Sequence, residues 1–281
     1  IHGSPTCSLS FGDQGACEGF LLGTEPFQGM RMMFQMMNEA RIMTGMQGVA
    51  LSSVAYENAK RYALERLQGT DISKTKTGGH EAAPIIRHAD VRRMLLLQKS
   101  HVEGMRALAY NAAYIADKAE TTTDADAKEA LEDRLALLTP IVKAFCTDQG
   151  FLMCSEAIQV FGGYGYCGEY PVEQAARDAR IAPLYEGTNF IQAADLLGRK
   201  LPRNGGAGFQ GLMAEITQFV EANSGIDELK ATAEMVGKAR DAVLGAVGTL
   251  MQSTGAGDFE FPMSVATRFL HMLGELFTGW Q

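Results

Sequence analysis

The sequence has little of what disulfide-linked, zinc-binding or membrane-spanning proteins require. Its five cysteines are unevenly spaced without a C-x-x-C pair, and no two of its five histidines stand four residues apart. No apolar run approaches the roughly 18 residues of a membrane-spanning helix. These absences argue against a disulfide framework, a zinc-helix motif and a membrane span. The cysteine pattern favours reduced thiols in a cytoplasmic protein.

Positive charge is also in short supply. Lys and Arg number 25 against 33 Asp and Glu, which gives a net charge of −8. An acidic chain of this kind is a poor general binder of nucleic acid. With 46% apolar and 21% charged residues, the 281-residue chain can bury a core, which excludes a disordered tail or a coiled rod. The length suggests two domains, or one large domain with an appendage.

The periodicity of the apolar residues divides the chain into three parts. Residues 1–28 are rich in glycine and Ser8-Leu9-Ser10-Phe11 alternates, so we expect short strands and turns there, at the end of a β-domain. Residues 29–200 repeat at helical spacing, which predicts an up-down helical bundle. Residues 201–281 are expected to form an additional, truncated helical domain behind a linker at 201–207. The predicted fold class is therefore mostly α.

The expected helices have boundaries that the structure can test. They cover 29–67, 84–120, 128–161, 169–182, 188–200, 209–222, 226–252 and 261–280. Gly69 is a plausible cap behind the first helix, and the loop at 121–126 carries capping residues for the third. The chain opens without an initiator Met and closes directly behind an apolar helical stretch, so we expect it to be a segment of a longer polypeptide.

Two motifs suggest ligand sites that the surrounding sequence does not support. The run from Gly163 to Gly168 matches the dinucleotide fingerprint G-x-G-x-x-G. That fingerprint follows a strand, whereas a helix is expected here, so we interpret the run as a tight turn that another backbone or a ligand approaches. Asp124-x-Asp126 lacks the central glycine of a calcium loop and is better interpreted as a helix start, so no metal site is expected.

The segment around Glu186 is the most suggestive for chemistry. Glu186 stands between Tyr185 and Gly187, just before a helix that Thr188 can cap. A carboxylate at this place can serve as a base. An ordinary loop acid near a helix start is at least as good an interpretation from the residues alone, because the helix dipole tolerates negative charge there.

Three blocks of sequence together resemble the acyl-CoA dehydrogenase family. They are Asn38-Glu-Ala-Arg41 with Tyr62-Ala-Leu-Glu-Arg66, then Glu156-Ala-Ile-Gln159-Val-Phe-Gly162-Gly163-Tyr-Gly165 followed by Glu169-Tyr-Pro171, and Arg177-Asp-Ala-Arg180 through Tyr185-Glu186-Gly187-Thr188. The resemblance covers roughly residues 1–200. Residues 201–281 look like the extra C-terminal helical domain of a longer subgroup, which includes enzymes similar to methylmercaptopropionyl-CoA dehydrogenase and broad-range bacterial acyl-CoA dehydrogenases.

The resemblance implies a flavoenzyme that oxidises an acyl-CoA thioester to a 2-enoyl-CoA. In this family FAD lies between a β-domain and the helical bundle and reaches a neighbouring subunit. A homodimer or homotetramer and an electron-transfer flavoprotein as partner are therefore implied. The chain is then expected to lack the family's N-terminal helical domain and most of its β-domain.

The resemblance also implies roles for individual residues. Glu186 matches the base that removes the α-proton while hydride passes to flavin N5. The matching substrate-binding residues are Asn38, Arg41, Tyr185 and Gly187. The matching FAD-binding residues are Arg66, Gln159, Gly162, Gly163 and Thr188. Some relatives carry the base one residue before the arginine of the first helix; Ala40 occupies that position here, which favours Glu186.

Two other interpretations remain open at this point. One is an acyl-CoA oxidase of similar architecture, which passes electrons to oxygen. The other is a non-catalytic helical assembly module. A flavin spectrum separates an enzyme from such a module, and peroxide release separates an oxidase from a dehydrogenase.

Overall fold

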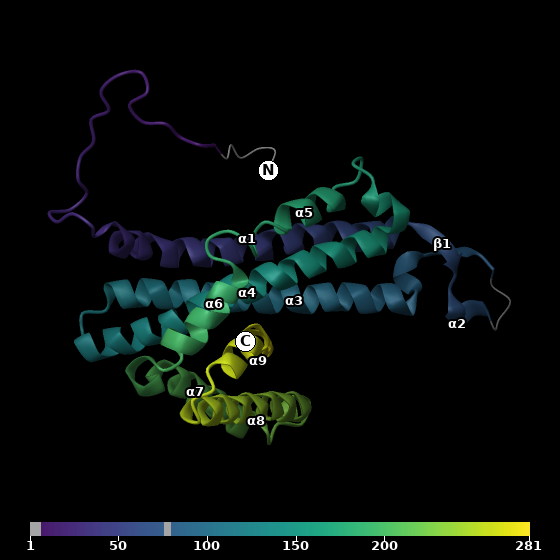
Figure 1. Ribbon diagram of the computed structural model, residues 1–281. Coiled ribbons are helices and arrows are strands. Elements are labelled where there is room, and N and C mark those ends of the chain that lie inside the picture. The colour runs from purple at the N-terminus through teal and green to yellow at the C-terminus, as the bar shows by residue number, and fades with distance from the viewer. Residues whose placement is uncertain (1–6, 76–79) are drawn as a thin grey trace. The chain divides into compact units, whose positions relative to one another are not determined.

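A computed structural model describes residues 7–75 and 80–281 (Figure 1). The chain separates into two compact units, of which the first ends at Met37 and the second is Asn38–Gln281. The prediction of a mostly helical bundle is confirmed. The strands expected in residues 1–28 do not form between 7 and 28, where the chain is exposed turn and bend. An alternating segment without a neighbouring strand cannot bury a face, which explains the difference. The expectation for residues 1–6 lies outside the described residues.

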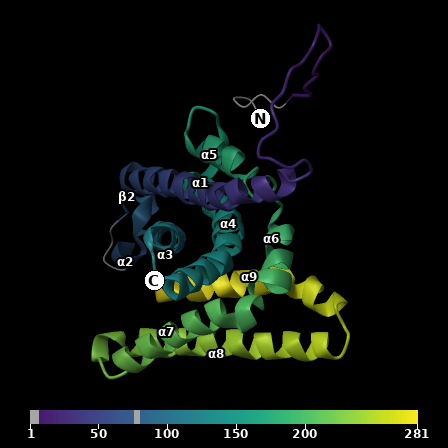
Figure 2. The same ribbon diagram turned by 90° about the vertical axis from the view of Figure 1, so that its left-hand side faces the viewer.

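Four helices form the frame of the bundle. They are α1 (Gly29–Glu65), α3 (Ala89–Thr121), α4 (Ala125–Phe161) and α5 (Val172–Ala179). Helices α3 and α4 run antiparallel, and the Asp124 carboxylate caps α4 by accepting a hydrogen bond from the Ala127 amide at 2.8 Å. The capping expected in this loop is thereby confirmed. Figures 1 and 2 show α4 in the middle of the second unit.

A small hairpin interrupts the sequence between α1 and α3. It consists of β1 (Leu67–Thr70) and β2 (Ala82–Pro84), paired antiparallel, with the short helix α2 (Ile72–Thr75) between them. The prediction that Gly69 caps the first helix is wrong, because α1 ends at Glu65 and Gly69 lies within β1. The Ile85 amide donates to the Arg66 carbonyl at 2.9 Å, and this pairing draws the chain out of the helix.

The helices after α5 complete the second unit. They are α6 (Asn189–Asp195), which continues as a π-helix over Leu196–Lys200, then α7 (Ala207–Asn223), α8 (Asp227–Gly255) and α9 (Glu260–Trp280). Helix α9 lies between α8 and the bundle and contacts α3, α4 and α6 (Figure 2). Leu138 of α4, Leu212 of α7 and Leu270 of α9 belong to one hydrophobic core.

The segment predicted as a linker is tied to the bundle. Its residues Arg203–Gly206 form a 3-10 turn, in which Arg203 Nε and Asn204 Nδ2 donate to the Asp133 carboxylate at 2.5 and 2.8 Å. Asp133 is buried in α4. The linker is therefore a fixed connection. The division of the chain into domains at residues 28 and 200 stays a prediction.

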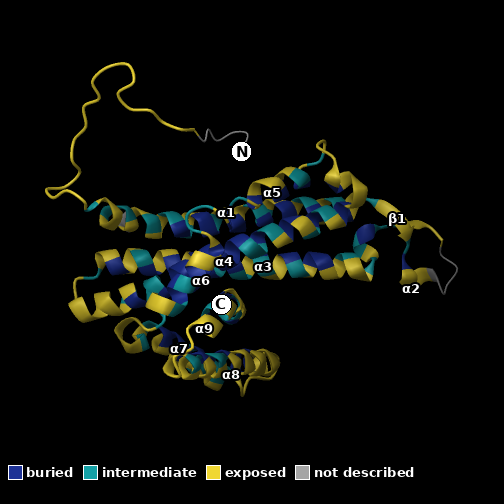
Figure 3. Ribbon diagram, in the orientation of Figure 1, coloured by how far each residue is buried: buried dark blue, intermediate teal, exposed yellow. Residues whose placement is uncertain are grey.

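The core runs along α4 (Figure 3). Residues 137–147 of this helix are buried all round, which explains why its apolar pattern has little one-sided character. A second cluster packs Ala55, Ala59 and Ala63 of α1 against Ala157 of α4 and Ala176 of α5. None of the helices in the described part of the chain is both long and apolar enough to cross a bilayer.

Helices α1 and α4 touch backbone to backbone. A Cβ atom on Gly48 would lie 3.0 Å from Thr147 Cα, and one on Gly150 would lie 2.7 Å from the Gly48 carbonyl oxygen. A Cβ on Gly45 would meet the Val142 carbonyl oxygen at 2.7 Å. Glycine is therefore required at this crossing because the two backbones leave no room for a side chain.

Gly48→Ala tests this crossing. The added methyl group has to push the two helices apart, so we expect the free energy of unfolding to fall by about 1–3 kcal/mol. Gly245→Ala is the matched control, since Gly245 is an exposed helical glycine with no atom near its Cβ position. That change should raise stability by about 0.5–1 kcal/mol. Urea unfolding of the full-length protein, followed by circular dichroism, measures both; equal effects of the two substitutions would contradict the crossing.

Candidate functional site

The loop between α5 and α6, residues 180–188, holds Glu186 in an unusual conformation. Glu186 has a φ of +57° and Gly187 a φ of +84°. The left-handed region costs a residue with a side chain about 1–2 kcal/mol. We refer to residues 180–188 as the Glu186 loop. Strain of this kind in a loop is typical of functional sites, and it persists only where the surroundings hold the chain in place.

The Glu186 loop is held in place by hydrogen bonds from α4. Lys143 Nζ donates to the Gly187 carbonyl and to Asn189 Oδ1, each at 2.8 Å. Asn189 in turn donates through Nδ2 to the Ala144 carbonyl at 3.2 Å and to Thr147 Oγ1 at 3.1 Å. Lys143, Thr147 and Asn189 are all buried. The peptide that follows Glu186 is therefore attached to the middle of α4 through a buried polar network.

Burial lowers the pKa of Lys143 to about 8. The carboxylates of Asp148 and Glu186 raise this pKa and the cation of Arg41 lowers it, but desolvation of the charged form is the largest effect. A buried ammonium is costly unless its hydrogens are bonded, and two of them are. Below pH 8 the Glu186 loop thus lies against a buried positive charge.

Arg41 reaches the same loop from α1. It is 5% exposed and lies 3.8 Å from the Asp195 carboxylate, which also accepts from Arg199 Nε at 2.5 Å. A Cβ on Gly187 would lie 3.6 Å from Arg41 Nη2 and 2.7 Å from Gln192 Nε2. Arg41 Nε has no hydrogen-bond partner among the described residues. Gly187 therefore makes room for the Gln192 amide, and Arg41 lies within van der Waals reach of the loop as a second buried cation.

Tyr185 and Thr188 complete this part of the site. The Tyr185 hydroxyl donates to the Gln47 side chain of α1, and Thr188 caps α6 by accepting from the Ile191 amide at 3.4 Å. The structure thus brings together five of the expected residues around the Glu186 loop. They are Arg41, Tyr185, Glu186, Gly187 and Thr188.

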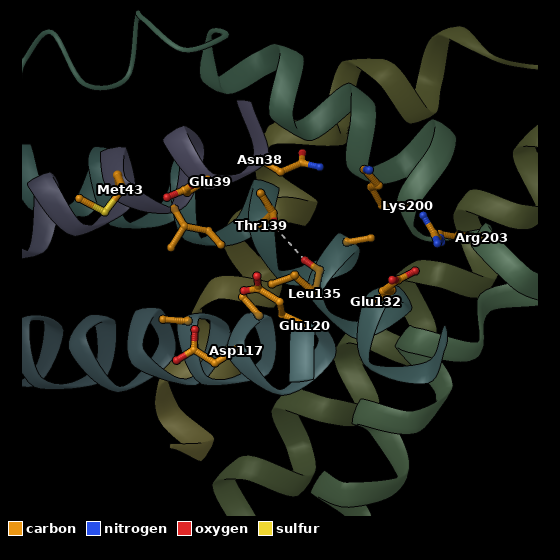
Figure 4. Close-up of a pocket in the computed structure, with 14 residues that line it drawn as sticks. Asn38, Glu39, Met43, Asp117, Glu120, Glu132, Leu135, Thr139, Lys200 and Arg203 are labelled. Atoms are coloured by element: carbon orange, nitrogen blue, oxygen red, sulfur yellow. Dashed lines mark hydrogen bonds between the residues drawn. The ribbon is translucent and has the colours of Figure 1, made fainter. Parts of the chain in front are cut away.

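Asn38 lies in a different environment. It lines a cavity of about 570 Å³ between α1, α3 and α4 (Figure 4). The cavity is lined by acidic side chains, among them Glu39 and Glu132, and by the basic side chains of Lys200 and Arg203. Its lining does not include Arg41 or the Glu186 loop. The expected contact of Asn38 with a substrate therefore stays a prediction.

The remaining expected cofactor residues gather at the far end of α4. Gly162 ends this helix with a φ of +64°, and Gln159 and Gly163 are exposed beside it. The Arg66 guanidinium lies over the Tyr164 ring, 5.2 Å from its centre. From Lys143 to Gly162 the helix rises about 28 Å at about 1.5 Å per residue, so the Glu186 loop and the glycine turn are separate.

Sequence reasoning missed the residues that support the Glu186 loop. Lys143, Asn189, Gln192 and Asp195 are buried polar side chains. One signal was available, because Lys143 is the only charged residue in the apolar run Ile141-Val142-Lys143-Ala144-Phe145-Cys146. A lysine in such a run lies either at a surface or in the interior with hydrogen-bond partners. Because the run places apolar residues on every side of the helix, it favours the interior.

Glu186→Gly tests the strain in the loop. Glycine adopts a positive φ without steric cost, so we expect the free energy of unfolding to rise by up to about 1 kcal/mol. Glu186→Gln keeps the strain and should leave stability within about 0.5 kcal/mol of the wild type. Urea unfolding of the full-length protein measures the difference; a glycine variant less stable than the glutamine variant would show that the turn is not strained.

Comparison with known proteins places these features in a family. Residues 28–201 match the family model described as "Acyl-CoA dehydrogenase, C-terminal domain", and residues 212–281 match "Acetyl-CoA dehydrogenase C-terminal like". The sequence is 39% identical to a butyryl-CoA dehydrogenase of Syntrophomonas wolfei over 99% of this chain and 46% of the relative. It is 37% identical to the 3-methylmercaptopropionyl-CoA dehydrogenase of Ruegeria pomeroyi, over 100% of this chain and 46% of that protein.

The fold is similar as well. An acyl-CoA dehydrogenase of Bacillus anthracis, solved with FAD, superposes with a TM-score of 0.68 at 21% identity, over 89% of this chain and 42% of that chain. The chain thus spans about half the length of the curated relatives that it matches. The two family models and the alignments over the whole chain establish that this chain belongs to the acyl-CoA dehydrogenase family.

Proposed function

We propose that this chain forms the helical part of an FAD-dependent acyl-CoA dehydrogenase in which Glu186 is the base. One observation carries the proposal: the strained turn that presents Glu186 is held by Lys143 and approached by Arg41, both buried. A loop acid without a role needs neither strain nor two buried cations. The same polar network also argues against a non-catalytic assembly module. Burying charged side chains costs free energy that apolar side chains would not, so a module that only packs has no use for them.

The proposed reaction removes two hydrogens from neighbouring carbons of the acyl group. Glu186 takes the α-proton, the electron pair of that C–H bond forms the α,β double bond, and hydrogen leaves the β-carbon with its two electrons. The chemistry that FAD supplies when bound is acceptance of that hydrogen and electron pair at N5. The chain's own contribution is to hold the carboxylate of Glu186 in place. It also keeps water from the side of the loop that faces α4, where Lys143 and Asn189 are buried.

The residues at the far end of α4 suit a phosphate-containing cofactor. In the part of the chain that the structure describes, Arg66 makes no ion pair, so its charge is free for an anion. A Cβ on Gly162 or Gly163 would meet nothing within 4 Å, which leaves the turn's backbone open to a ligand. We propose that Arg66, Gln159, Gly162 and Gly163 contact the dinucleotide of FAD bound mainly by a second subunit, and Thr188 the flavin of the chain's own site.

The remaining partners follow from the same proposal. Acyl-CoA is the substrate, with Arg41, Tyr185 and Gly187 near its reacting end, and the assembly is a homodimer or homotetramer. We propose an electron-transfer flavoprotein as the electron acceptor. Release of hydrogen peroxide during turnover without such an acceptor would favour the oxidase instead.

Glu186→Gln tests the base. The amide keeps the shape of the side chain but cannot accept the α-proton, so FAD should stay bound while flavin reduction falls by several orders of magnitude. The measurement is anaerobic bleaching of the flavin by butyryl-CoA in the full-length enzyme. Bleaching of the variant at the wild-type rate would remove Glu186 from the reaction.

Arg66→Glu tests the shared cofactor site. Placing a negative charge against the FAD pyrophosphate should weaken FAD binding by about 2–5 kcal/mol, the usual loss for a buried charge pair that is broken. Arg61→Glu is the matched control, because Arg61 is exposed in the last turns of α1, which ends just before Arg66, and bonds only to Asn58 among the described residues. Fluorescence titration of the apoprotein with FAD and sedimentation of the holoenzyme measure affinity and assembly. A monomer whose FAD affinity does not respond to Arg66→Glu would contradict the shared site.

A further inference from the structure

Lys143 is a charged residue at a place where packing alone would favour an apolar one. Its side chain is fully buried in the middle of α4, among Val142, Ala144 and Phe145 of the core. Moving an ammonium ion out of water costs several kcal/mol, and a methionine of similar length would fill the space without that cost. The charge therefore calls for an explanation beyond stability.

The contacts of Lys143 are concentrated on the peptides next to Glu186. Its Nζ donates to the Gly187 carbonyl at 2.8 Å, one residue after Glu186, and to Asn189 Oδ1 at 2.8 Å, three residues after it. Gln192 Nε2 donates to the same Gly187 carbonyl at 3.3 Å. Because Asn189 is itself bonded to Ala144 and Thr147, α4 supports the turn at several points.

These contacts act on a conformation that does not persist by itself. Glu186 and Gly187 both have positive φ. Glycine adopts this conformation freely, but Glu186 holds it only when its surroundings determine it. The carbonyl that Lys143 binds belongs to the second of these residues, so its orientation sets the direction of the turn. Without the lysine, the loop can relax and the carboxylate of Glu186 can turn away.

We propose that Lys143 is a positioning residue for the reaction, which holds the Glu186–Gly187 turn by binding the Gly187 carbonyl and places a positive charge behind the carboxylate of Glu186. The inference rests on the proposed function of Glu186 as the base. The proposal gives a residue of α4 the task of positioning the base, which differs from the roles expected for the other site residues. Lys143 acts through Glu186 and does not itself touch the acyl group.

The charge on Lys143 changes in a range where the enzyme can be assayed. The charged groups around it are Arg41 from α1, Asp148 on α4 and Glu186 from the loop. Asp148 also meets α9, where His271 Nε2 lies 3.0 Å from Asp148 Oδ2. Burial brings the pKa of Lys143 to about 8 despite the two carboxylates. Below this pH the ammonium is present; above it the proton is lost and the charge behind Glu186 disappears.

Lys143→Met in the full-length holoenzyme tests the proposal. With butyryl-CoA, we expect the limiting rate of flavin reduction to fall at least 10-fold, while the concentration for half-maximal rate changes less than 3-fold and FAD stays bound. The wild-type rate should decline above pH 8, and the variant should lack this decline. Lys99→Met is the matched control, because Lys99 is exposed on α3 and pairs with Glu103; it should keep the wild-type rate and pH profile.

The double variant Lys143→Met/Glu186→Gln decides whether Lys143 acts through Glu186. Its rate of flavin reduction should equal that of Glu186→Gln, since a residue that positions the base has no effect once the base is gone. A further loss of 10-fold in the double variant would show an independent role and overturn the proposal. If the methionine variant does not fold, Lys143→Gln takes its place in the single and double variants, because the glutamine amide donates hydrogen bonds without carrying a charge.

The outcomes separate this inference from the proposed function. A wild-type rate in Glu186→Gln would overturn the assignment of the base. A slow Glu186→Gln enzyme together with an unimpaired Lys143→Met enzyme would overturn only the role of Lys143. The pH profile of the wild-type enzyme needs no variant, and a rate without any transition between pH 7 and 9 would contradict the role of the charge.

Discussion

The contact between the backbones of α1 and α4 is the constraint on which the site depends. Gly45 and Gly48 of α1 lie against Val142, Thr147 and Gly150 of α4 with no room for a side chain between them. Arg41 stands seven residues before Gly48, and Lys143 stands seven before Gly150. Seven residues are about two helical turns, so each cation lies on the same face as its glycine. The crossing therefore brings both cations to the Glu186 loop at once.

The polar network beneath the loop explains why the bundle is not a uniformly apolar core. The bundle buries four charged or polar side chains beside the fully buried stretch of α4, namely Arg41, Lys143, Asn189 and Asp195. Each unpaired polar group there would cost about 1–3 kcal/mol, and most are bonded to one another or to the loop. The molecule thus accepts charges in its interior where they can determine the conformation of a short segment. The same segment carries the backbone strain.

The helices could be predicted from the sequence because their apolar residues recur at helical spacing. The wrong predictions concern segments whose structure depends on hydrogen bonds to residues far away in the sequence. Gly69 lies in a strand because Ile85 bonds to Arg66, and residues 7–28 form no strand because they have no neighbour to pair with.

At the site, the Glu186 loop and Arg41 could be found from the three family blocks. Lys143, Asn189 and Asp195 could not be found, because their role depends on which side chains meet in the interior. A single sequence does not reveal such meetings. The attachment of the segment 201–207 to Asp133 was missed for the same reason.

The position of α9 has a thermodynamic consequence. His271 on this helix bonds to Asp148, its ring meets the edge of Phe145, and Gly274 lets the Phe145 side chain lie against the helix backbone. Phe145 and Asp148 follow Lys143 on α4 by two and five residues. Contacts from α9 and contacts from the Glu186 loop and Asn189 thus fall on neighbouring residues of one stretch of α4, residues 143–148. Energetic coupling between two sites is reciprocal. Where this stretch of α4 couples the two, a ligand that orders the loop tightens the attachment of α9 by the same free energy that the docked α9 adds to binding of the ligand.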